Sequence, residues 1–135
     1  MIRNKIHIAN TSEINELKRS IMKNNNIRLV EISGNTISSW EEYAAELERQ
    51  LKFPTSCIRS VDIYLDWIQD LSWIDENELI IIIYDFDRFI ESNPSLKNEI
   101  ISDFEEVILP FWESEVEKCV VGGKAKSFNV YLANE

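Results

Sequence analysis

The segment Leu79–Tyr84 (LIIIIY) is an uninterrupted run of six apolar residues near the middle of the chain. Branched aliphatic and aromatic residues favour strands, and a strand that is apolar at every position is typically covered on both faces. The run is too short for a membrane-spanning helix, which needs about 20 apolar residues. It therefore predicts a fully buried central strand.

Other candidate strands lie to both sides of this segment along the chain, at residues 5–9 (KIHIA), 27–33 (IRLVEIS) and 128–132 (FNVYL). Apolar residues at helical spacing separate them. Helix starts are predicted at Thr11 or Ser12, Ser38 or Ser39, Ser60, and Asn93-Pro94. We expect Pro110 to kink or break the fourth helix.

The alternation of strands and helices predicts an α/β fold, with a three- to four-stranded, mostly parallel sheet packed with about four helices in two or three layers. The 135 residues suit one domain, and the sequence shows no repeat or linker. We therefore treat residues 1–135 as a single domain.

The acidic residues are concentrated in one part of the chain. The net charge is −10, but residues 62–117 alone hold sixteen acidic residues against Arg88 and Lys97, a net of −14. Such a charge repels nucleic acid and anionic membranes, and it attracts a strongly basic protein. Solubility alone is the alternative explanation.

The remaining composition argues against several kinds of site. Residues 1–20 lack a signal-peptide pattern, so we expect a cytoplasmic protein with Cys57 and Cys119 reduced. His7 is the single histidine, too few for a zinc cluster, and three glycines leave no Gly-rich phosphate loop. We expect neither a metal nor a cofactor.

The third predicted helix, at about residues 60–71, has two different sides. Its core side is expected to carry Val61, Tyr64, Leu65, Ile68 and Leu71. Asp62 and Asp66 lie four apart on the other side, Asp70 extends the same face, and Ile63 and Trp67 lie beside it. An aromatic residue among carboxylates is typical of interface anchors. A solvated face, with Trp67 folded onto a neighbouring helix, is the alternative.

The segment from Phe53 to Ile74 (FPTSCIRSVDIYLDWIQDLSWI) resembles the barstar family of ribonuclease inhibitors. In that family, a helix ends at a Phe-Pro or Leu-Pro step, and an aromatic-rich loop leads to a helix with two Asp residues four apart. Many members end this helix with Asp-Leu-Ser-Trp. Phe53-Pro54, Asp62, Asp66 and Asp70-Leu71-Ser72-Trp73 match this order. The resemblance covers about residues 27–135, so residues 1–26 are an additional strand and helix.

The resemblance implies an inhibitor rather than an enzyme. Barstar-like proteins plug the active site of a small secreted ribonuclease with this helix and the preceding loop. The Asp at the position of Asp66 lies where a substrate phosphate would sit, and the Asp at the position of Asp62 supports the loop side. We therefore expect an immunity protein, monomeric when free, that blocks a basic nuclease toxin, with a ribonuclease as the first candidate, and protects the bacterium that makes it.

The loop departs from the family pattern. Ser56 and Cys57 replace the aromatic pair, and Ile58 replaces a glycine, which removes backbone freedom. Either the partner differs from a barnase-like ribonuclease, or binding has shifted toward Trp67 and the acidic face. The predicted partner contacts are Asp62, Asp66, Trp67, Asp70 and Ile63, followed by Ser56, Cys57, Ile58 and Arg59.

Two alternatives remain open at this point. One is an acidic interaction module without a nuclease partner. The other is a magnesium-dependent phosphotransferase, because Asp85 and Asp87 directly follow the Leu79–Tyr84 strand, where such enzymes place their carboxylates. Phe89 occupies the position of the expected hydroxyl residue, so we favour a solvated loop and predict no catalytic residue.

Overall fold

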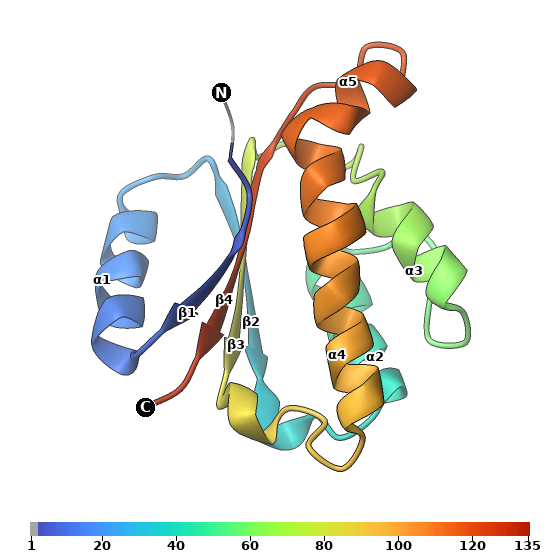
Figure 1. Cartoon of the computed structure of the whole chain (residues 1–135). Coiled ribbons are helices and arrows are strands. Elements are labelled where there is room, and N and C mark those ends of the chain that lie inside the picture. Colours follow the sequence, from blue (N-terminus) through green and yellow to red (C-terminus); the bar gives the residue numbers. More distant parts are fainter. Residues whose placement is uncertain (1–2) are drawn as a thin grey trace.

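The computed structural model describes residues 3–135 and has a four-stranded sheet at its centre, in the order β1-β4-β3-β2 (Figure 1). All three strand pairs are parallel, and Val30, Ile81 and Val130 lie side by side across the sheet. The strands are β1 (Ile6–Ala9), β2 (Ile27–Ser33), β3 (Glu78–Tyr84) and β4 (Ser127–Ala133). The predicted parallel sheet, with an additional N-terminal strand, is confirmed.

The β3 strand is interior and covered on both faces, as its composition predicts. Leu79, Ile81 and Ile83 belong to the larger hydrophobic core, whereas Ile80 and Ile82 belong to a smaller core on the opposite face. All five side chains are at most 3% exposed. Because successive side chains of a strand point to opposite faces, this run joins the two cores.

Helices on both faces give the molecule three layers (Figure 1). The α1 helix (Thr11–Met22) covers one face of the sheet. The other face carries α2 (Trp40–Leu51), α3 (Val61–Ile68) and α4 (Pro94–Asp103). The α/β class and the approximate number of helices are confirmed.

The helix starts follow ordinary capping chemistry. Asn10 caps α1, one residue before the predicted Thr11 or Ser12, because its Oδ1 accepts the N–H of Glu13 at 2.9 Å while Glu13 Oε1 accepts the N–H of Asn10 at 3.0 Å. The predicted caps of the other helices are confirmed: Ser39 for α2, Ser60 for α3 and Asn93 for α4.

The fourth helix does not break at Pro110. The helical run continues from α4 through two π-helical segments, Phe104–Ile108 and Phe111–Glu115, to α5 (Val116–Cys119). Pro110 itself keeps helical angles, with φ −62° and ψ −35°. The wide turns on either side accommodate a residue that lacks an N–H and whose ring crowds the preceding turn.

Among the helices of residues 3–135, none has both the length and the apolar character needed to cross a membrane.

Candidate protein-binding site

The α3 helix is anchored by one buried side and presents the other to solvent. Tyr64 and Ile68 are fully buried, and Leu71 is 1% exposed just beyond the helix. The helix ends at Ile68 rather than near Leu71, because Leu71 adopts a left-handed backbone with φ 50°. Val61 was predicted to be core but is 38% exposed, since it lies in the first turn at the edge of the packed side.

Asp62, Asp66 and Asp70 form an acidic stripe along the exposed side of α3 and its end. All three are exposed, and none makes an ion pair with any residue in the described part of the chain. Asp62 lies in the first helical turn, where a negative charge interacts favourably with the helix dipole. The stripe therefore offers three uncompensated carboxylates to solvent.

Apolar side chains border the acidic stripe. Ile63 is 38% exposed, and Trp67 is half-buried. The Trp67 indole N–H donates to Thr55 Oγ1 at 2.8 Å, and its ring meets Trp73 edge-on at 5.6 Å between centroids. Trp67 thus packs on the preceding loop and on Trp73 and leaves part of its surface beside the carboxylates.

All four tryptophans of the chain brace this region through their indole N–H groups. Trp40 donates to the Ile58 carbonyl at 2.8 Å, Trp67 to Thr55, Trp73 to the Leu51 carbonyl at 2.7 Å, and Trp112 to the Ile68 carbonyl at 2.8 Å. The acceptors span the end of α2, the loop and the end of α3. A buried or half-buried indole N–H needs such a partner, so each contact fixes both ring and backbone.

A buried tyrosine pair joins α3 to α2. The hydroxyl oxygens of Tyr43 and Tyr64 lie 2.7 Å apart, and both residues are fully buried. Burial is the main reason that the pKa of each phenol lies well above its ordinary value. Both hydroxyls therefore stay neutral and paired, which fixes the orientation of α3 beneath its exposed face.

The loop at residues 55–60 is held by Glu48 of α2. Glu48 Oε1 accepts hydrogen bonds from Ser56 Oγ at 3.0 Å and from the Cys57 N–H at 2.9 Å. Ser56 Oγ also accepts the Ile58 N–H at 3.3 Å. The side chain of Arg59 is exposed and makes no ion pair within residues 3–135.

Cys57 does not belong to the exposed surface, although we predicted that it contacts the partner. Its side chain is fully buried and packs in the larger core. Burial, followed by the charge of Glu48, raises the pKa of the thiol to about 12. Cys57 therefore fixes the loop from below, while Cys119 is exposed; both are free thiols.

The structure brings together most of the predicted contact residues on one surface. Two residues that the sequence analysis missed, Glu48 and Trp40, support the loop at this surface. Glu48 carried no sequence signal, because its role depends on the path of a loop that comes eight residues later. Trp40 is the first residue of α2. Its neighbours in a surface hollow are Glu41, Ile58, Arg59, Ser60 and Val61.

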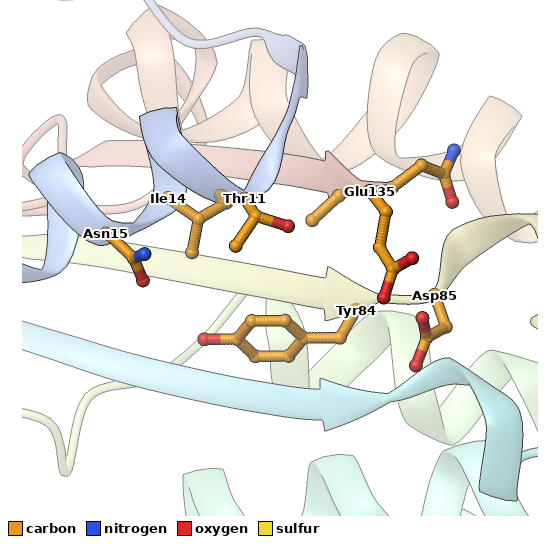
Figure 2. Close-up of a pocket in the computed structure, with 8 residues that line it drawn as sticks. Thr11, Ile14, Asn15, Tyr84, Asp85 and Glu135 are labelled. Atoms are coloured by element: carbon orange, nitrogen blue, oxygen red, sulfur yellow. The ribbon is translucent and has the colours of Figure 1, made fainter.

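Asp85 and Asp87 lie elsewhere, at the carboxyl edge of the sheet. Asp85 lines a cavity of about 160 Å³. Figure 2 shows it near Tyr84 and near Thr11 at the start of α1. Asp87 is exposed, and its N–H donates to Asn134 Oδ1 at 3.1 Å. Phe89 is fully buried. Within residues 3–135, no group of three or more His, Cys, Asp or Glu side chains is arranged to hold a metal ion.

Comparison with known proteins places this surface in a family. The family model described as Barstar (barnase inhibitor) matches residues 27–123, which include α2, the loop, α3 and α4. The chain belongs to the barstar family. The match begins after α1, so β1 and α1 lie outside it, and the family is one of inhibitors.

Two further comparisons give no information about function. A search of the curated proteins found no match. The structure is similar to that of the Aeropyrum pernix ORC2 protein in its ADPNP-ADP complexes, with a TM-score of 0.50 and 9% identity. The alignment covers 98% of this chain but 34% of that one, so this chain spans about a third of its length. At this identity the similarity concerns the fold alone.

Proposed function

We propose that this chain is an immunity protein that binds a basic nuclease toxin in the cytoplasm and blocks its active site. A ribonuclease is the first candidate, because the matching family is described by its inhibition of barnase. The protein would act by occupying the site, without chemistry of its own. Monomeric when free, it would present one face to the toxin.

The observation that carries this proposal is the acidic stripe on a braced helix. Asp62, Asp66 and Asp70 are exposed and lack an ion-pair partner in the described chain. A nuclease binds phosphate groups with cationic side chains, and a carboxylate held in position can take the place of a phosphate. Because α3 is already fixed before binding, little side-chain and loop freedom is lost on association.

The charge distribution supports a basic partner. Residues 62–117 carry a net charge of −14, and α3 lies within this segment. Such a field accelerates the encounter with a cationic protein and weakens as salt screens it. The proposed contact surface consists of the acidic stripe, Ile63 and Trp67, with Ser56, Ile58 and Arg59 from the loop.

Barnase is the first probe for this function, followed by a panel of other basic bacterial ribonucleases. RNA cleavage is measured while purified chain is added, and association rates are measured at low and moderate salt. We expect stoichiometric inhibition of at least one enzyme, with an association rate that falls as salt rises. Binding without inhibition would instead favour an acidic interaction module, and no binding to any basic nuclease would contradict the proposal.

A further inference from the structure

One carboxylate oxygen connects the loop before α3 to the last turn of α2. Glu48 Oε1 accepts both the Ser56 hydroxyl at 3.0 Å and the Cys57 N–H at 2.9 Å. Hydrogen bonds to an ionised acceptor are stronger than those between neutral groups. Ser56 and Cys57, which provide these two donors, are the residues that replace the family's aromatic pair.

Further hydrogen bonds hold other residues of the loop. Thr55 accepts the Trp67 indole, the Ile58 carbonyl accepts the Trp40 indole, and the Ser60 N–H donates to the Cys57 carbonyl at 3.1 Å. The loop contains no glycine, which lowers the conformational freedom of the open state. Both features indicate a loop with one preferred shape.

We propose that Glu48 is a positioning residue, which holds residues 55–60 in the shape that the partner meets without touching the partner itself. The inference rests on the proposed function, because it takes the loop to be part of the contact surface. When Glu48 is absent, the Cys57 N–H and the Ser56 hydroxyl lose their common acceptor, and the loop samples open shapes that must be reordered on binding.

The chain contains a built-in reporter for loop opening. The Cys57 thiol is fully buried beneath the loop, whereas Cys119 is exposed near the end of α5. A thiol reagent needs both access and thiolate. Cys57 therefore reacts when the loop opens, and Cys119 supplies the reference rate in the same molecule.

The experiment compares Glu48→Ala and Glu48→Gln with the matched control Glu46→Ala. Glu46 lies on the same helix, but its carboxylate accepts Arg49 and Gln50 rather than the loop. Labelling of each cysteine in the free, folded chain is followed by mass spectrometry, and thermal unfolding is recorded for every variant. Exchange of the Cys57 amide hydrogen compares loop opening among the same variants and does not depend on the reactivity of the thiol.

We expect Glu48→Ala to raise the labelling rate of Cys57 about tenfold or more, because both hydrogen bonds are lost. Glu48→Gln keeps an acceptor oxygen and should stay within about threefold of the parent. Glu46→Ala and every Cys119 rate should be unchanged. For a nuclease that the parent chain inhibits, Glu48→Ala should slow association while Glu48→Gln should not.

Equal Cys57 labelling in Glu48→Ala and Glu46→Ala would overturn the inference, because the loop would then keep its shape without Glu48. Equal acceleration in Glu48→Ala and Glu48→Gln would also overturn it, since the charge felt by the thiol, not the hydrogen bonds, would set the rate. The labelling experiment uses the free chain, so its failure is distinct from failure to bind a nuclease.

Discussion

Asp66 occupies the middle of the acidic stripe, with Asp62 and Asp70 four residues to either side. Trp67 follows it and packs against Thr55 and Trp73. A carboxylate in this position is flanked by like charges but not neutralised within the described chain. We therefore expect Asp66 to contribute to the proposed complex rather than to the stability of the fold.

We expect Asp66→Ala to weaken nuclease binding by about 2–5 kcal/mol, mostly through a faster dissociation rate, because the partner's cations are left desolvated and unpaired. The free energy of unfolding should barely change, since an exposed charge that repels its neighbours contributes little stability. Binding kinetics and urea denaturation of the same variant measure both quantities.

Asp87→Ala is the matched control for Asp66→Ala. It removes the same charge from an exposed aspartate at the carboxyl edge of the sheet, away from α3. The control should keep the dissociation rate of the parent chain. Binding of Asp66→Ala as tight as that of the parent chain would contradict the prediction and indicate that binding depends mainly on the altered loop or on the N-terminal strand and helix.

Helical spacing was enough to predict which side of α3 is acidic and exposed, but not how the loop packs. The prediction for Cys57 depended on a family pattern in which this position is aromatic and external. In this chain the smaller thiol fits beneath the loop instead. Glu48 could not be found from the sequence, because only the folded loop brings Ser56 and Cys57 to it.

At the scale of single elements, the long helix beside α3 contains a repulsive cluster. Asp103 is half-buried at the end of α4, and Glu99 and Glu106 lie four residues before and three residues after it. Burial, followed by these two carboxylates, raises the pKa of Asp103 above its ordinary 3.8. The folded state therefore favours the protonated form, and ionised Asp103 lowers stability.

We expect Asp103→Asn to raise the free energy of unfolding by about 0.5 kcal/mol near neutral pH, because it removes two like-charge contacts. The advantage is full above the raised pKa of the folded state and disappears as the pH falls below 3.8, where Asp103 is protonated in both states. Urea denaturation of parent and variant from neutral to acidic pH checks this.

Glu105→Gln provides the comparison for Asp103→Asn. Glu105 is exposed in the adjoining π-helical segment and has no acidic residue three or four positions away. Its substitution should change stability less. A stability gain from Asp103→Asn that persists unchanged at acidic pH would rule out electrostatic repulsion as the cause.

Capping residues and hydrophobic periodicity were enough to predict the helices and strands. They did not predict that the fourth helix continues across Pro110. A proline in a helical pattern ordinarily predicts a kink or an end. The π-helical turns on either side accommodate Pro110 within the helical run, and no local sequence pattern predicts them. The same holds for the exposed start of α3 at Val61, which depends on where the surrounding elements stop.

At the scale of the whole molecule, the N-terminal segment before the family match adds an edge strand and a helical layer to the sheet, and β4, which follows the match, is also part of that sheet. β1 pairs with β4 at one edge, and α1 covers the face opposite α3. Alternating strands and helices predicted a parallel sheet, but they could not supply the strand order. In the observed order, β1 and β2 are consecutive in the chain but lie at opposite edges of the sheet. Local sequence patterns do not contain this information.

Ile14 tests whether this added layer stabilises the domain without taking part in binding. Its side chain is 2% exposed and packs in the smaller core with Ile80 and Ile82. We expect Ile14→Ala to lower the free energy of unfolding by about 2–4 kcal/mol, because it removes buried methyl groups and leaves a cavity. Chemical denaturation measures this loss.

Nuclease affinity should be unchanged in Ile14→Ala at temperatures where the variant is folded, since α1 and α3 lie on opposite faces of the sheet. Met22→Ala is the control on the same helix, because Met22 is 86% exposed and its removal should change stability by at most about 0.5 kcal/mol. A large loss of affinity in Ile14→Ala would contradict this and indicate either that α1 contributes to binding or that the two faces are coupled through β3. Its alternating side chains are the direct connection between the two cores.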